Sequence, residues 1–253
     1  LEIGRQQRSE LYAISPSRSP VLIDRKLRLE VDERVGADGT VLQVLDPTSL
    51  DTLVRRVRRL KPEAAAVCLL FSFLRPSHER AVRAALRNAG IRWVSISSEV
   101  LPEHREYERS STTAVDAYVG PAMGRYIGRL ERAIKGRLWI VQSNGGVLKA
   151  DEAVKAPVQS VLSGPAAGVE GARTFAVRSG FDHIVTLDMG GTSTDVSICP
   201  GQPLQRRDAE VGGLPIAIPM TDIHTVGAGG GSIAGVDEAG SLRVGPQSAG
   251  AEP

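Results

Sequence analysis

The sequence has 253 residues, of which 42% are hydrophobic and 24% are charged, a composition that suits one large or two moderate globular domains. Its 31 basic and 29 acidic residues leave a formal charge of +2, which argues against nucleic acid or an anionic membrane as a partner. No apolar run approaches the roughly 20 residues of a membrane-spanning helix and no leader segment is recognisable, so we expect a cytoplasmic protein.

The first third of the sequence alternates strand and helix patterns. Residues 27–46 predict two strands joined by the turn GADG, in which Gly36 and Gly39 take the positive φ of hairpin turns. Residues 47–60 place apolar side chains at helical spacing. A buried strand, a helix and a second strand are predicted next, at residues 64–73, 77–90 and 91–97. Strand, helix and strand in succession imply parallel pairing through a right-handed crossover, so the predicted fold class is α/β.

The middle of the sequence is mostly helical in pattern. Residues 101–135 are compatible with helix, and Pro121 is expected to separate two helices. A strand at residues 137–143 runs into the loop NGG, which is either a plain turn or a contact with substrate or another lobe. The helix predicted at residues 164–180 is rich in Gly and Ala, which lets another group approach its backbone closely.

The stretch IVTLDMGGTSTDVSIC, residues 184–199, predicts a hairpin with unusual chemistry at its turn. A strand that ends in Asp188, turns on Gly190 and Gly191 and returns would aim successive backbone N–H groups into one concavity, where anions bind. Asp188 and Asp195 can hold Mg²⁺ together with waters and phosphate oxygens. Hydroxyl donors are added by Thr192, Ser193 and Thr194. The alternative is a tight turn whose Asp and Thr side chains cap their own backbone.

A second glycine loop lies at residues 227–232. Glycines are conformationally costly, so their density predicts that backbone approaches a ligand or the other lobe here. They are Gly227, Gly229, Gly230 and Gly231. Asp222 and His224 precede the loop at strand spacing, which would point both side chains to one face. They could ligate a divalent metal or act as base and orienter, or His224 could be a hydrogen-bonded structural residue.

Four ordered motifs together resemble the hydantoinase A and 5-oxoprolinase family, a branch of the actin-like, sugar-kinase and heat-shock-chaperone ATPase superfamily. The motifs are VQSNGG from Val141, SGPAAGVEGA from Ser163, DMGGTSTDV from Asp188 and DIHTVGAGGGSIA from Asp222. The segment EVLPEHREYERSSTTAVDAYV and the opening LEIGRQ resemble it too. The resemblance implies ribonuclease H-like or actin-like ATPase lobes with mixed sheets. It assigns residues 1–108 to the C-terminal part of the family's N-terminal domain and residues 109–253 to the N-terminal part of the hydantoinase A domain.

The resemblance also implies a reaction. Members open hydantoin or 5-oxoproline rings with ATP, which we interpret as phosphorylation of a carbonyl that amide resonance makes inert. Carried over to this sequence, ATP phosphates lie at residues 190–194, with Asp188 and Asp195 as catalytic acids beside Mg²⁺ or another divalent metal. The implied partners are a small cyclic amide and a hydantoinase B-type subunit or domain, in an oligomer.

Two loops of the family, of the types DxGGTFTD and GGAGPxHA, do not occur in this sequence. We therefore expect a piece of the ATP-binding subunit that is inactive by itself and binds ATP weakly. Three alternatives stay open: a subunit of an ATP-dependent acetone or ketone carboxylase, a non-catalytic actin-like nucleotide-binding scaffold, and a small-molecule kinase, which would need a general base in the first lobe.

Overall fold

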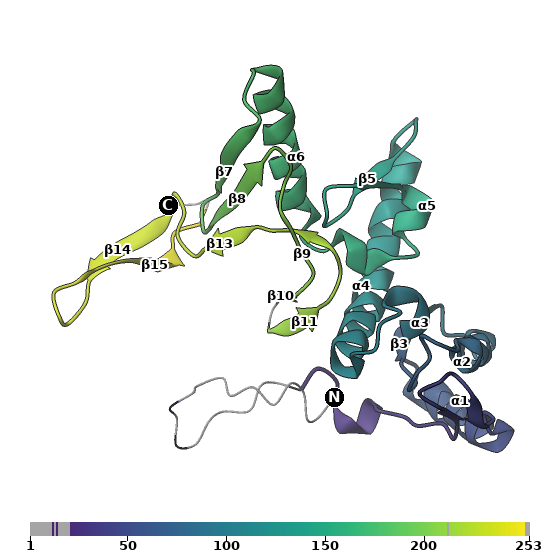
Figure 1. Cartoon of the computed structure of the whole chain (residues 1–253). Helices are drawn as coiled ribbons and strands as arrows, with labels where there is room; N and C mark the ends of the chain where they lie inside the picture. Colours follow the sequence, from purple (N-terminus) through teal and green to yellow (C-terminus); the bar gives the residue numbers. More distant parts are fainter. Residues whose placement is uncertain (1–11, 13, 15–20, 212, 251–253) are drawn as a thin grey trace. The chain divides into compact units, whose positions relative to one another are not determined.

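The structure, a computed structural model, describes residues 12, 14, 21–211 and 213–250. These residues form two compact units, and the elements of both are labelled in Figure 1. Of the described residues, unit 1 takes those up to 138, those at 150–158 and those within 207–218, and unit 2 takes those at 139–149, 159–206 and 219–250. The motif LEIGRQ lies outside the described residues. The chain passes repeatedly between the units, and the domain boundary at residue 108 stays a prediction.

Unit 1 begins with a short turn of helix and a hairpin. The 3-10 helix η1 spans Arg25–Leu27, and strands β1 (Arg34–Val35) and β2 (Val41–Gln43) pair antiparallel. Both strands are shorter than predicted. Gly39 takes the predicted positive φ, at +81°, and Gly36 does not.

A parallel strand pair with its helices forms the core of unit 1. The elements are α1 (Pro47–Leu60), β3 (Ala64–Val67), α2 (Ser77–Asn88) and β4 (Trp93–Ile96). Asp46 caps α1 by accepting a hydrogen bond from the Ser49 N–H at 2.7 Å. As predicted, β3 and β4 are parallel. Their apolar side chains pack with those of the helices in one cluster that includes Leu53, Val57, Val67, Val82, Leu86, Val94 and Ile96.

The strand predicted over residues 64–73 is wrong beyond Val67. The Leu69 N–H donates to the Glu79 carboxylate at 2.9 Å, and the Leu69 carbonyl accepts from the Arg109 guanidinium at 2.9 Å. Both side chains are fully buried, so they occupy the backbone groups that would otherwise join a sheet. The apolar run therefore leaves β3 after four residues.

The prediction that Pro121 separates two helices is wrong. One helix, α4, spans Glu106–Ala133 with Pro121 inside it. It packs on β3 and β4, where Gly120 and Gly124 lie against the Trp93 ring. A proline inside a helix costs about 3 kcal/mol. Burial of this helix face offsets that cost, which is a tertiary effect that local sequence does not encode.

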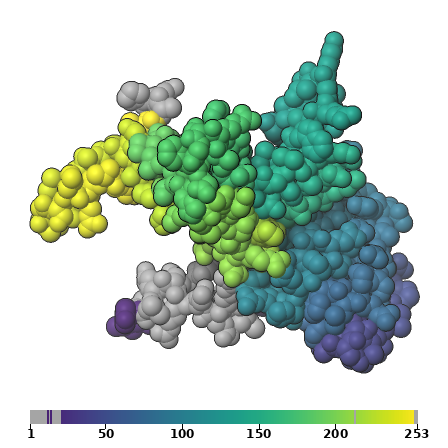
Figure 2. Space-filling view, turned by 45° about the horizontal axis from the view of Figure 1, so that its top comes forward, coloured from purple at the N-terminus to yellow at the C-terminus, as the bar shows by residue number. Residues whose placement is uncertain are grey.

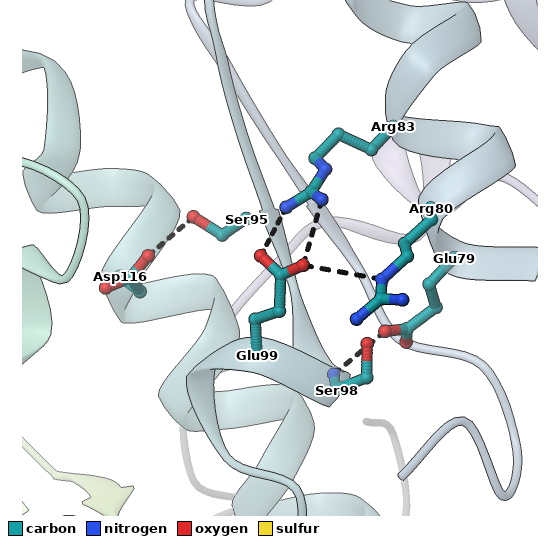
Figure 3. A network of polar contacts seen from close by, with 7 residues as sticks. All are labelled: Glu79, Arg80, Arg83, Ser95, Ser98, Glu99 and Asp116. Carbon is teal, nitrogen blue, oxygen red and sulfur yellow. Dashed lines mark hydrogen bonds and ion pairs between the residues drawn. The ribbon is translucent and has the colours of Figure 1, made fainter. Parts of the chain in front are cut away.

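Hydrogen bonds of two buried acids join α2 to α3 and α4 to β4 in unit 1 (Figure 3). The buried Glu79 carboxylate of α2 accepts from the Ser98 N–H at 2.8 Å, at the start of α3 (Ser97–Val100). It also accepts from the Ser97 hydroxyl at 2.6 Å. In α4, Asp116 accepts from the Ser95 hydroxyl at 2.6 Å and from the Val158 N–H at 3.0 Å. Burial raises the pKa of the Asp116 carboxyl. The remaining elements of unit 1 and its borders are α5 (Ala150–Ala153), η2 (Pro157–Ser160), β10 (Ala209–Val211) and β11 (Leu214–Ile216).

Unit 2 is built around a three-stranded antiparallel sheet and one helix. The sheet has the order β13-β8-β7, from β7 (His183–Met189), β8 (Thr194–Pro200) and β13 (His224–Val226). Helix α6 (Ser163–Arg178) packs on β7 and β8. Ala166 and Val169 of this helix are buried with Cys199 and Ile223 in a small core.

Two-stranded antiparallel pairs complete unit 2. Strand β5 (Trp139–Val141) pairs with β6 (Val147–Lys149), and β9 (Gln205–Arg206) pairs with β12 (Met220–Thr221). Strands β14 (Ser232–Val236) and β15 (Leu242–Ser248) form a hairpin that projects from the rest of the unit, in yellow in Figure 2. Helices with small parallel and antiparallel sheets confirm the predicted α/β class. Among the described residues, no helix combines the length and the hydrophobicity that crossing a membrane requires.

Candidate functional site

The predicted hairpin is formed by β7 and β8. Its register pairs Asp188 with Asp195 and Met189 with Thr194, so the two carboxylates start from directly opposite backbone positions. The four residues between the strands, 190–193, are called the Gly190 turn below. The Gly190 N–H donates to the Ser193 carbonyl at 2.9 Å, which closes the turn.

The Gly190 turn presents further N–H groups. Among the described residues, the structure records no acceptor for the N–H groups of Gly191, Thr192 and Ser193. Gly191 and Thr192 are exposed and Ser193 is half-buried. A run of N–H donors in a turn is the arrangement that binds anions.

The two acids differ in their surroundings. Asp188 is exposed, and its Oδ2 lies beside α6, 3.6 Å from where a Cβ on Gly168 would stand. Asp195 is half-buried and accepts a hydrogen bond from the Thr225 hydroxyl of β13 at 2.6 Å. Asp195 is therefore held in one orientation, whereas Asp188 is open to a ligand. Thr225 could not be predicted from the sequence, because its hydrogen bond to Asp195 joins segments about thirty residues apart.

The hydroxyl of Thr194 is already engaged. It donates to the Ala228 carbonyl at 2.7 Å, and the side chain is buried. Of the three predicted hydroxyl donors, only Thr192 and Ser193 thus lie in the turn itself.

Residues 227–231 of the second glycine loop lie against the Gly190 turn. The Gly230 N–H donates to the Gly190 carbonyl at 2.9 Å, and the Gly231 N–H donates to the Gly191 carbonyl at 2.7 Å. The structure thus brings together two of the predicted site segments. The contact is between backbone groups of the protein.

The predicted placement of Asp222 and His224 on one strand is wrong, because β13 begins at His224. The Asp222 N–H donates to the Leu204 carbonyl at 2.7 Å, which takes this residue out of the sheet. Its carboxylate lies 3.5 Å from the Arg206 guanidinium, and His224 is exposed. Within the described ranges, no three His, Cys, Asp or Glu side chains are grouped as a metal site would require. A metal role for these two residues stays a prediction.

The NGG loop is the turn of the β5–β6 hairpin. Gly145 has φ +83°, and a Cβ there would lie 2.9 Å from Glu170 Cγ on α6. The buried Ser143 hydroxyl donates to the carbonyls of Gln159 and Val161, just before α6 begins. These contacts fasten the hairpin to the helix that flanks Asp188.

Comparison with protein families decides the assignment that the motifs and the hairpin suggested. Residues 109–253 match the hydantoinase/oxoprolinase family, and residues 1–90 match the hydantoinase/oxoprolinase N-terminal region. The chain belongs to the hydantoinase/oxoprolinase family. The family membership predicted from the four motifs is confirmed.

Relatives of this hydantoinase/oxoprolinase chain are longer proteins. Caprolactamase subunit alpha from Pseudomonas jessenii is 35% identical over 263 residues, which cover 100% of this chain and 37% of the relative. 5-Oxoprolinase 1 from Arabidopsis thaliana is 34% identical over 278 residues, which cover 100% of this chain and 22% of the relative. The chain therefore spans well under half the length of the relatives it matches.

Two solved structures resemble the fold. The ATP-dependent caprolactamase from Pseudomonas jessenii matches with a TM-score of 0.81 at 34% identity, over 96% of this chain and 36% of that one. Nucleotide-free acetone carboxylase matches with a TM-score of 0.76 at 27% identity, over 93% of this chain and 34% of that one. The likeness to two ATP-dependent enzymes is consistent with the predicted actin-like ATPase fold.

Proposed function

We propose that this chain is part of an ATP-dependent cyclic amide hydrolase and that the Gly190 turn holds the terminal phosphates of ATP. The observation that carries the proposal is the pair of carboxylates placed opposite each other across a turn in which, among the described residues, three N–H groups have no recorded acceptor. The names of two relatives, a caprolactamase and a 5-oxoprolinase, support a cyclic amide as the substrate class.

The residues present fit a nucleotide phosphate with its magnesium ion. The N–H groups of Gly191 and Thr192 can donate to phosphate oxygens, and the glycines bring no side chain between backbone and ligand. Asp188 and Asp195 supply the carboxylate oxygens that Mg²⁺ or another divalent ion accepts. When bound, ATP would supply the phosphoryl group that turns an inert amide oxygen into a leaving group.

The chain's own residues then act by position and charge. Phosphoryl transfer depends mainly on alignment and on stabilisation of developing negative charge, and rigid N–H donors provide both. Asp195, held by Thr225, keeps a fixed carboxylate next to the turn. Asp188 is the exposed acid and is free to orient a metal ion or a water molecule.

The active protein would contain more than this chain. The caprolactamase relative is described as a subunit alpha, so at least one relative works in a multi-subunit enzyme. We extend this to a hydantoinase B-type subunit or domain as the partner here and to an oligomer as the active form.

A carboxylase is the second candidate function. The fold match to acetone carboxylase favours it, since the same turn could serve phosphoryl transfer to a different acceptor. ATP hydrolysis that depends on both bicarbonate and a ketone would establish this candidate in place of the first.

The test uses the longer protein with its partner subunit. ATP turnover and ring opening are measured with a panel of a seven-membered lactam, 5-oxoproline and hydantoin. We expect Asp188→Asn to lower lactam-dependent ATP turnover by roughly 100-fold, as loss of a transition-state electrostatic contact does. Asp182→Asn, at the far end of the same hairpin, is the matched control and keeps full activity. Unchanged turnover in Asp188→Asn would remove the assignment of the turn.

A further inference from the structure

Two carbonyl groups of the Gly190 turn, those of Gly190 and Gly191, accept hydrogen bonds from segments outside the turn. The Gly190 carbonyl accepts from the Gly230 N–H at 2.9 Å, and the Gly191 carbonyl accepts from the Gly231 N–H at 2.7 Å. The hydroxyl of Ser248, at the end of β15, donates to the Gly191 carbonyl as well, at 3.1 Å. Two segments remote in sequence thus bind the backbone of the turn.

The approach is so close that side chains are excluded. A Cβ on Gly229 would lie 2.4 Å from the Gly190 carbonyl oxygen and 2.8 Å from the Ser193 nitrogen. A Cβ on Gly231 would lie 2.6 Å from the Gly250 carbonyl oxygen. These neighbours are backbone atoms, which cannot rotate away as the end of a side chain can. The contact therefore explains the glycines at positions 229 and 231, whereas a Cβ on Gly227 would meet nothing within 4 Å.

The loop is itself fastened on both sides. The Thr194 hydroxyl donates to the Ala228 carbonyl at 2.7 Å, and the Ala249 N–H donates to the Gly231 carbonyl at 2.8 Å. The turn, the loop and the end of β15 are therefore cross-linked by hydrogen bonds in both directions.

These contacts fix the direction of the Gly191 and Thr192 N–H groups, because a peptide group is planar. In a planar trans peptide the carbonyl and the following N–H point in opposite directions. The Gly190 carbonyl shares a peptide plane with the Gly191 N–H, and the Gly191 carbonyl shares one with the Thr192 N–H. Because both carbonyls are held toward the loop, both N–H groups are turned away from it, where an anion can reach them.

We propose that residues 227–231 and Ser248 are positioning residues that lock these two peptide planes for phosphate binding. The inference rests on the proposed function and refines it. It changes the role predicted for Gly229, Gly230 and Gly231 from direct ligand contact to support, since the N–H groups of Gly230 and Gly231 are already donated to the turn.

The test compares three variants of the longer protein with its partner. Ser248→Ala removes one hydrogen bond to the Gly191 carbonyl and one from the Gly250 N–H without adding atoms. We expect it to raise the KM for ATP about 2- to 10-fold, the range that loss of one such hydrogen bond gives. Gly229→Ala, which forces the backbones apart, should raise the KM further. Gly235→Ala in β14 is the control, because a Cβ there meets nothing within 4 Å.

The readout separates positioning from stability. A merely structural role would lower the melting temperature and the active fraction and would leave the KM for ATP unchanged. That result in Ser248→Ala would overturn the inference even where Gly229→Ala does not fold. The proposed function fails by a different result. If Asp188→Asn keeps full ATP turnover, the turn is not the phosphate site. If Asp188→Asn loses ATP turnover but Ser248→Ala has a normal KM for ATP, only the positioning role is contradicted.

Discussion

Two glycines of α4 should respond in opposite directions to the same substitution. A Cβ on Gly124 would lie 2.5 Å from Trp93 Cζ2 and 2.8 Å from Cη2, whereas a Cβ on Gly128 meets nothing within 4 Å. Replacing glycine by alanine inside a helix stabilises it by about 1 kcal/mol. At Gly128 this gain stands alone. At Gly124 it is set against an overpacking cost of about 1–3 kcal/mol.

The Trp93 ring cannot easily yield at Gly124. It also lies against Gly120, where a Cβ would stand 3.0 Å from Cε3, so the ring is confined along α4. We therefore expect Gly124→Ala to be destabilised by about 1 kcal/mol and Gly128→Ala to be stabilised by about 1 kcal/mol. The gain in helix propensity is the same in both variants. The difference between their free energies of unfolding therefore equals the overpacking cost at Gly124.

Urea denaturation followed by tryptophan fluorescence measures both changes, because Trp93 is one of the two tryptophans of the sequence. Equal stabilisation of the two variants would refute the packing of Trp93 on α4. It would also remove the reason given for the continuity of this helix through Pro121.

Two further predictions concern single side chains. Thr225→Val removes the hydroxyl that holds Asp195 and should lower ATP turnover of the longer protein about 5-fold. Thr225→Ser keeps a hydroxyl and should have the turnover of the wild type. Equal turnover of the wild type and both variants would contradict the orienting role of Thr225. Burial raises the pKa of Asp116, so its folded state binds a proton more tightly than its unfolded state. The cost of the buried charge is present at neutral pH and is relieved as the pH falls from the raised pKa toward the ordinary Asp value. The free energy of unfolding, measured from pH 7 to pH 4, should therefore rise in the wild type relative to Asp116→Asn. If the difference between the two proteins stays constant over this range, the buried charge does not carry this cost.

Locally encoded parts of the fold could be predicted from the sequence. Helix α1 has its apolar period and its capping Asp46 within one short segment, and the β7–β8 hairpin has alternating strands about a glycine turn. The strand–helix–strand order of β3, α2 and β4 was enough to predict parallel pairing. In each case, the signal and the element occupy the same residues.

Features that depend on remote partners could not be predicted. Strand β3 ends at Val67 because Glu79 and Arg109 take the backbone groups of Leu69. Helix α4 continues through Pro121 because of packing against other elements.

The candidate site shows the same division. The turn chemistry of Asp188 and Asp195 is visible in the sequence. The contact of the glycine loop with this turn joins residues about forty positions apart, and the glycines of the loop suggest a close approach without naming the partner.

Equilibrium binding of ATP and AMP to the longer protein tests the central claim most directly, namely that the Gly190 turn and its two acids bind the terminal phosphates with magnesium. Asp188→Asn should weaken magnesium-dependent ATP binding by roughly 10- to 100-fold, the effect of losing one charged contact, and should leave AMP binding unchanged. Equal affinities of the wild type and Asp188→Asn for ATP, or an equal loss for ATP and AMP, would contradict the account.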